Sequence, residues 1–368
     1  MTPPRLVSLD VFRGLTMASM VIVNNPGDWG NVYAPLLHAP WHGLTPTDLI
    51  FPFFLFIVGV SITLAKRSSA SAATIFRRAL LIFALGMLLA LYPRFDFSTV
   101  RIPGVLQRIA VCYLAVALIH RTAGRSFSSG EARRAILITL TGAMSLLLIY
   151  WALIFRDLTP DGNLGAVIDR AIFGPHLWRQ SRTWDPEGLL STLPAIATTL
   201  TGLAAGYVIA SEWTMREKLR ALAIGSLAAM ALGFAWSFAF PLNKSLWTSS
   251  YVLVTSGLAG LLLARLHGGL DNGRFGGSAV RGFGGFVILG RNALLLFVVS
   301  GCLAKTLSLI RVDNGQGSTL ALGRWIYLSW FAPLADPKNA SLLYAFANLA
   351  VLFLLLWWLH RRRWYVRV

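Results

Sequence analysis

Residues 24–59 read NNPGDWGNVYAPLLHAPWHGLTPTDLIFPFFLFIVG, and this stretch decides both the fold and the position of the site. Strongly apolar segments lie on both sides of its polar part, which carries asparagine, histidine and aspartate side chains but no Lys or Arg. Side chains that exchange protons are costly beside hydrocarbon, so a cluster of them at the end of an apolar segment usually has a function. The stretch therefore predicts a polar site at the end of a membrane helix.

The composition agrees with a membrane protein. Of the 368 residues, 56% are hydrophobic and only 13% are charged, whereas about 25% of a soluble domain is charged. The apolar residues fall into repeated runs of about 20, the length that crosses a bilayer core. We predict an all-α polytopic membrane protein that forms one domain over residues 1–368.

Hydropathy predicts about ten membrane-spanning helices. The first retains Arg5 on its flank without a small-residue cleavage pattern, so we expect it to stay in the protein as an anchor. The region 318–332 is too short and amphipathic to span, and we expect an interfacial helix there, with an eleventh span as the alternative. The ten predicted spans are 6–25, 47–66, 74–92, 103–120, 134–155, 188–210, 217–240, 246–265, 286–309 and 340–360.

The charged residues predict the topology. The net charge of +18 comes from Lys and Arg that flank apolar runs, which is typical of membrane anchors in contact with lipid and gives little support to nucleic-acid binding. Alternate connections are rich in Arg, and the others hold few, such as Lys244 alone. By the positive-inside rule both termini are cytoplasmic, and the His38 loop lies on the outer side of a bacterial inner membrane.

The outer loop contains a candidate acid–base group. His38 is the side chain type most readily poised to exchange a proton near neutral pH. Asp48 is placed to orient its imidazole, and Asn24, at the end of the preceding helix, is placed to donate a hydrogen bond to an oxyanion. Trp41 and His42 adjoin this group. The alternative is a loop histidine that only binds backbone atoms.

Other ionisable residues suggest two clusters. Arg13, Arg291 and Asn292 lie towards the inner side, where arginines suit a phosphate-bearing ligand; a structural Asp10–Arg13 ion pair is the alternative for the first. Glu187 closes the long outer loop 156–187, the kind of loop that often selects a substrate. Arg108, inside a span, requires an acidic partner or a ligand.

Several chemistries are disfavoured by what the sequence lacks. It contains no Walker-type loop, paired-histidine zinc motif or nucleophile elbow, so we expect no metal site. Cys112 and Cys302 lie inside apolar runs and are interpreted as small buried side chains.

Six blocks of the sequence resemble the heparan-α-glucosaminide N-acetyltransferase family of transmembrane acyltransferases, most densely over residues 5–65. The resemblance implies acetyl transfer from cytosolic acetyl-CoA to an amino sugar across the membrane, with His38, Asn24 and Asp48 matching the family's catalytic residues. We assign Arg13, Arg108, Arg291 and Asn292 to the cofactor and Glu187, Trp41 and His42 to the sugar. A homodimer is a possible assembly by analogy. The blocks are SLDVFRG (8–14), VN (23–24), HAPWHGLT (38–45), DLIFP (48–52), GVLQR (104–108) and GRN (290–292).

Two mechanisms and three functions remain open from the sequence. In a ternary complex His38 takes a proton from the acceptor amine, which attacks the thioester; in a ping-pong cycle His38 is acetylated first. A sugar or metabolite transporter is the competing function, because intramembrane charges also suit a carrier. O-acetylation of an envelope glycan is the third. The lysosomal members carry a large N-terminal domain that we do not recognise here, and we expect free glucosamine or a cell-envelope amino sugar as the acceptor.

Overall fold

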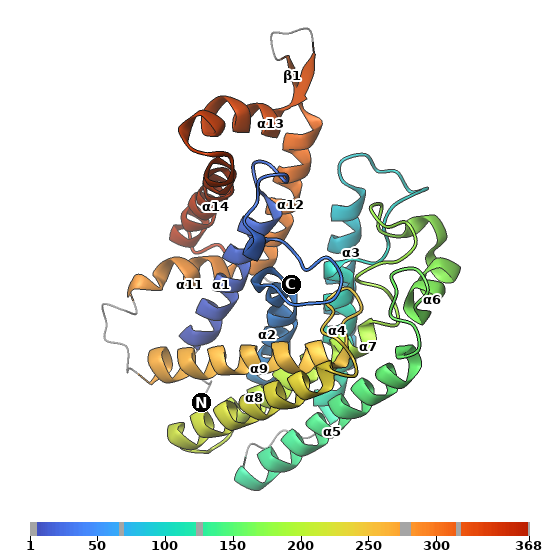
Figure 1. The fold of residues 1–368 in the computed structure, drawn as a ribbon. Coiled ribbons are helices and arrows are strands. Elements are labelled where there is room, and N and C mark those ends of the chain that lie inside the picture. Colours follow the sequence, from blue (N-terminus) through green and yellow to red (C-terminus); the bar gives the residue numbers. More distant parts are fainter. Residues whose placement is uncertain (1–5, 66–69, 123–127, 273–280, 314–317, 367–368) are drawn as a thin grey trace.

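The computed structural model describes residues 6–65, 70–122, 128–272, 281–313 and 318–366. It is a bundle of long helices joined by compact loops (Figure 1). Within the described ranges, nine helices are long and apolar enough to cross a membrane, and a bent pair brings the number to ten if it counts as one span. The predicted all-α polytopic fold is confirmed.

The nine helices follow the predicted spans within a few residues. They are α1 (Val7–Asn24), α2 (Ile50–Leu64, preceded by the 3-10 turn η2, Pro46–Leu49), α3 (Ala72–Leu91), α4 (Val105–Thr122), α5 (Ser129–Ile154), α7 (Thr192–Ala210), α8 (Met215–Ser237), α9 (Ser249–Leu266, continued by the π turn η4, His267–Asp271) and α14 (Pro337–Arg361).

The predicted span 286–309 is not one straight helix. It consists of α11 (Gly284–Arg291) and α12 (Ala293–Leu309), which meet at an angle of 80°. At the break Asn292 has φ −121° and ψ 36°, outside the helical region. A Cβ at Gly290 would lie 1.9 Å from the carbonyl oxygen of Asp10, so α11 packs with its backbone against α1. Packing against α1 accompanies the break, a long-range contact that hydropathy does not reveal.

The prediction of an interfacial helix over 318–332 is partly wrong. Its first residues form strand β2 (Thr319–Ala321), which pairs antiparallel with β1 (Arg311–Asp313). Helical structure begins only with α13 (Leu322–Ile326), followed by the π turn η5 (Tyr327–Phe331) and the 3-10 turn η6 (Ala332–Leu334). The strand depends on a partner outside the segment, which its own periodicity does not show.

The long loop 156–187 also contains a helix, α6 (Leu164–Phe173). Asn163 caps it by accepting a hydrogen bond from the backbone N–H of Ala166 at 2.9 Å. The short 3-10 turns η1 (Ala34–Leu36) and η3 (Gly174–His176) complete the loop structure.

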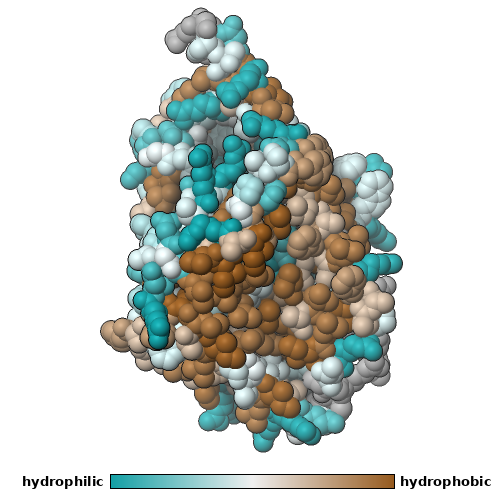
Figure 2. All heavy atoms as spheres, turned by 90° about the vertical axis from the view of Figure 1, so that its right-hand side faces the viewer, coloured by the Kyte–Doolittle hydropathy of each residue, from teal (hydrophilic) through white to brown (hydrophobic). Residues whose placement is uncertain are grey.

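Four loops meet at one end of the bundle, which we call the His38 end. The backbone N–H of Gly43 donates to Leu242, which joins the loops after α1 and α8, and that of Ile102 donates to His176, which joins the loops after α3 and α5. The opposite end, which carries Arg121 and Arg361, is called the Arg13 end. Figure 2 shows a broad hydrophobic area between hydrophilic margins, as a lipid-facing surface requires. Exposed apolar residues of α5 include Leu137, Ile138 and Leu148.

Candidate active site

Asp48 folds the loop that carries His38. Its side chain is 1% exposed, and its carboxylate accepts hydrogen bonds from the backbone N–H groups of Ala39 (3.2 Å) and Thr45 (2.9 Å). The hydroxyl of Thr45 donates to it as well, at 3.0 Å. The bond from the Thr45 backbone N–H to the Asp48 side chain is one half of a capping box at the start of η2. The carboxylate that begins the helix is therefore fixed before any ligand binds.

The same carboxylate orients His38. Asp48 Oδ1 lies 2.6 Å from His38 Nδ1, and a carboxylate only accepts hydrogen bonds, so we assign the ring proton to Nδ1. The Nε2 lone pair is then available to take a proton. The ring is 48% exposed and so can be reached from the loop side. The contact between these two residues is the geometry that the sequence predicted.

Lys244, which sequence reasoning placed only in an outer turn, is part of this site. Its Nζ lies 3.2 Å from His38 Nε2. Burial lowers the pKa of Lys244, against the attraction of Glu187 and Asp48. The neighbouring Asn243 contacts the His42 ring at 3.3 Å, so the turn after α8 meets both histidines.

An arginine–carboxylate cluster supports the site from the loop before α7. Arg101 Nε donates to Asp185 at 2.8 Å, and its Nη2 contacts both Asp185 and Glu187. Burial acts to raise the pKa of Glu187, but Arg101, Arg108 and Lys244 together hold it below the usual value. Glu187 is therefore a charged carboxylate that binds Arg101 and also attracts the ammonium of Lys244.

Arg108 is 2% exposed and only partly satisfied. Its Nη2 donates to the carbonyl of Gly188 at 3.0 Å and to the Ser191 hydroxyl. Its Nε and Nη1 are buried with no hydrogen-bond partner in the described part of the chain. Buried donors without a partner are costly, so these two N–H groups make Arg108 a candidate contact for an oxygen of a ligand.

Aromatic side chains form one wall near the site. Trp41 donates from its indole N–H to Leu158 at 2.8 Å, and its ring centroid lies 5.1 Å from that of Trp184. Trp178 continues the row, 5.5 Å from Trp184, with the guanidinium of Arg101 over its ring at 5.9 Å. Trp41 is thus fixed between the His38 loop and the long loop.

Asn24 is not joined to this group. It is exposed at the end of α1, and no hydrogen bond links it to His38 or Asp48 in the described ranges. Its neighbour Asn25 instead donates to the carbonyl of Val21 at 2.7 Å. The proposed oxyanion role of Asn24 stays a prediction.

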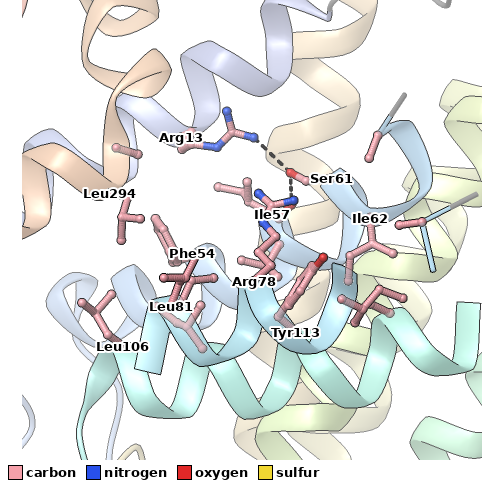
Figure 3. A pocket seen from close by; sticks show the side chains of 18 of the residues that line it. Arg13, Phe54, Ile57, Ser61, Ile62, Arg78, Leu81, Leu106, Tyr113 and Leu294 are labelled. Carbon is pink, nitrogen blue, oxygen red and sulfur yellow. Dashed lines mark hydrogen bonds between the residues drawn. The ribbon is translucent and has the colours of Figure 1, made fainter. Parts of the chain in front are cut away.

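A cavity of about 930 Å³ lies towards the Arg13 end (Figure 3). Arg13 forms an ion pair with Asp10 at 3.2 Å and donates to Ser61 at 3.0 Å. In Figure 3, Arg13 and Leu106 lie on opposite sides of the cavity. The Nε of Arg291 is buried without a hydrogen-bond partner in the described ranges. The basic lining consists of Arg13, Arg77, Arg78, Arg121 and Arg291.

The sequence pointed to two of these arginines. The other three, Arg77, Arg78 and Arg121, belong to the Arg-rich connections that predict the topology, and positive charges at helix ends look alike whether they face lipid, water or a ligand. Asn292 does not line the cavity; its amide binds the backbone of Trp364 (3.4 Å) and Val366 (3.1 Å). It thereby holds the C-terminal segment beside Arg291.

A second cavity, of about 740 Å³, lies at the His38 end. Its lining includes Arg94, Arg101, Trp178 and Lys305. Leu106 lines both cavities, whereas His38 lines neither. The two cavities therefore approach each other at the first turn of α4, close to Arg108. Within the described ranges, no group of three or more His, Cys, Asp or Glu side chains is arranged to hold a metal ion.

Comparison with known proteins identifies the family. A family model described as heparan-alpha-glucosaminide N-acetyltransferase, catalytic, matches residues 5–235. The heparan-alpha-glucosaminide N-acetyltransferase of Homo sapiens is 28% identical over 358 residues, covering 80% of this chain and 52% of that protein. The Mus musculus protein of the same name is also 28% identical, with 80% and 53% covered. The chain spans about half the length of these curated relatives. It belongs to the heparan-α-glucosaminide N-acetyltransferase catalytic family.

Proposed function

We propose that this protein is a membrane acetyltransferase that transfers the acetyl group of acetyl-CoA to the amino group of a glucosamine-type sugar. The observation that carries the proposal is the His38–Asp48 pair, with the imidazole half exposed at one end of a membrane bundle. The names of the relatives, which share the family, support the same reaction.

His38 acts as the general base. The Asp48 carboxylate keeps the proton on Nδ1, so Nε2 takes the proton of the acceptor amine as it attacks. Trp41, His42 and Glu187 surround this end of the bundle and are proposed to hold the sugar. Acetyl-CoA supplies the activated acyl group as a thioester.

The cavity at the Arg13 end fits an anionic ligand the size of a nucleotide. Its five arginines supply positive charge, and the buried Nε of Arg291 has no acceptor among the residues that the structure describes. Guanidinium groups bind phosphates through paired hydrogen bonds. We assign Arg13 and Arg291 to the phosphates and Arg108, with its two unpaired N–H groups, to an oxygen nearer the acyl end.

The proposed orientation places the Arg13 end in the cytosol and the His38 end on the outer side of a bacterial inner membrane. Positive residues at the Arg13 end support this orientation. The donor would then enter from one compartment and the acceptor from the other.

A carrier is the second candidate, because two cavities lined from opposite ends that approach at Leu106 also suit alternating access. One assay separates the two functions. Detergent-purified protein receives labelled acetyl-CoA and either glucosamine or N-acetylglucosamine. An N-acetyltransferase forms labelled N-acetylglucosamine from glucosamine without a sealed vesicle. Transfer of label to N-acetylglucosamine supplied as the acceptor would indicate O-acetylation. No product from either acceptor would reject the proposal.

The assignment of the base is tested in the same assay with His38→Ala. We expect a loss of kcat of about 10²–10⁴-fold, while His176→Ala, whose ring contacts the carbonyl of Val100, should retain activity. Full turnover by His38→Ala would show that another group is the base.

A further inference from the structure

Lys244 lies over the imidazole of His38, and the mechanism above gives it no role. Its Nζ is 3.2 Å from Nε2 and 3.5 Å from Nδ1. An ammonium in the ring plane on the Nε2 lone pair would lie much farther from Nδ1, because the two nitrogens point to different sides of the ring. The nearly equal distances place the ammonium against the ring face. The Nε2 lone pair therefore stays open for the acceptor amine.

The turn that presents Lys244 is rigid. Asn243 is fully buried; its side-chain oxygen accepts from the N–H of Leu246 at 2.8 Å, and its own N–H donates to the Thr248 hydroxyl at 3.0 Å. The N–H of Thr248 returns a bond to the carbonyl of Asn243 at 3.1 Å. The position of Lys244 is thus set by the backbone around it.

Lys244 is not paired with a carboxylate in the described part of the chain. Glu187 and Asp48 attract it, whereas Arg108 and Arg101 repel it. Asp48 already binds His38 and its own loop, and Glu187 already contacts Arg101. The ammonium donors of Lys244 remain for a ligand beside Nε2.

We propose that Lys244 is a further catalytic residue, whose ammonium donates a hydrogen bond to the thioester carbonyl oxygen as that oxygen becomes negative. The inference rests on the proposed function. The acceptor nitrogen bonds to the thioester carbon while its proton passes to His38 Nε2. The C–S bond then breaks, the imidazolium returns the proton to the departing thiolate, and Lys244 keeps its own protons throughout. A fixed donor at a developing oxyanion is among the largest contributions to catalysis.

The first test compares Lys244→Met with Lys244→Arg. Loss of one oxyanion donor costs about 10²–10³-fold in kcat, so Lys244→Met should lose that much with nearly unchanged KM, and Lys244→Arg should recover part of it. Lys338→Met, at the same end of the bundle over Tyr33, should behave as wild type. A kcat within about twofold of wild type in Lys244→Met overturns the proposal.

The second test does not depend on activity. Modification of His38 by diethyl pyrocarbonate, followed on its peptide by mass spectrometry, reports whether the Nε2 lone pair can be reached. With the ammonium against the ring face, wild type and Lys244→Met should both be modified at His38. Protection of His38 in wild type but not in Lys244→Met would place the ammonium on the Nε2 lone pair and contradict the geometry.

The outcomes separate this inference from the proposed function. If wild-type protein forms no product from either acceptor, the proposed function and the role of Lys244 both fail. If wild type is active, His38→Ala is inactive and Lys244→Met keeps full kcat, only the role of Lys244 fails.

Discussion

At the residue scale, Asp48 both folds its loop and orients His38. Its carboxylate receives two backbone N–H groups and the Thr45 hydroxyl in addition to the imidazole. Each donor removes part of the cost of burying the charge. The spacing of Thr45 and Asp48 is that of a capping box, whereas the contact of Asp48 with His38 depends on how the preceding loop returns.

Asp48→Asn should therefore reduce activity more than stability. The amide oxygen can keep the backbone donors, but its NH₂ group then faces Nδ1 and favours the tautomer in which Nε2 carries the proton. We expect kcat to fall by about 10²–10⁴-fold with a melting temperature close to that of wild type. Asp28→Asn, in the same loop, is the matched control and should retain kcat. An Asp48→Asn variant with more than half of the wild-type kcat would contradict this role.

The carboxyl of Asp169, on α6, predicts how the stability of the protein depends on pH. Burial raises its pKa to about 6 from an ordinary value of 3.8, although the N–H of Leu189 donates to its carboxylate at 2.8 Å. Between these values the folded state binds more protons than the unfolded state. The contribution of Asp169 to the free energy of unfolding therefore declines as pH rises from about 4 to about 6, by roughly 2–3 kcal/mol.

Asp169→Asn should remove this decline. The measurement is the melting temperature in detergent across that pH range, compared with wild type. Asp157→Asn is the control, because hydrogen bonds from Thr159 lower the pKa of that exposed carboxyl and place its titration below the range. Parallel pH curves for wild type and Asp169→Asn would show that the carboxyl is not the source.

At the element scale, close helix packing sets where the site residues lie. A Cβ at Gly202 would be 2.0 Å from the carbonyl oxygen of Phe56, and one at Gly59 would be 2.0 Å from that of Thr199. Helices α2 and α7 therefore touch backbone to backbone, as small residues permit in membrane bundles. Asp48 lies at the start of α2 and Ser191 immediately before α7, so this contact fixes the distance between the His38 loop and the Glu187 segment.

Gly202→Ala should separate these two helices. We expect a loss of stability of about 1–3 kcal/mol together with lower kcat, because both sides of the site move apart. Gly142→Ala is the control, since nothing lies within 4 Å of its added Cβ, and a helical Gly→Ala change in open space is neutral or stabilising. Equal melting temperatures for Gly202→Ala and wild type would rule out the tight contact.

At the scale of the whole molecule, two cavities approach from opposite ends at Leu106. This arrangement gives the proposed reaction a direction, since donor and acceptor would come from different compartments. The direction can be tested because each end of the bundle has an exposed loop residue that a labelling reagent can reach. Trp29, at the His38 end, is 64% exposed, and Glu212, between α7 and α8, is exposed at the other.

In a background of Cys112→Ala and Cys302→Ala, we expect Trp29→Cys to react with a membrane-impermeant maleimide on intact cells. Glu212→Cys should react only after permeabilisation, because the Arg13 end is proposed to face the cytosol. The reverse pattern would place His38 in the cytosol and contradict transfer across the membrane.

The sequence alone determined the helical membrane fold and nearly all span boundaries, because hydropathy and the length of a bilayer act locally. It also brought His38 and Asp48 to attention, since ionisable groups at apolar helix ends stand out. Only the tertiary structure decided the bend at Asn292, the strand at Thr319–Ala321, the arginines around the cavity and the place of Lys244 over the imidazole. Each of these depends on contacts between segments far apart in the chain, and such contacts leave no periodic or compositional signal in the residues that make them.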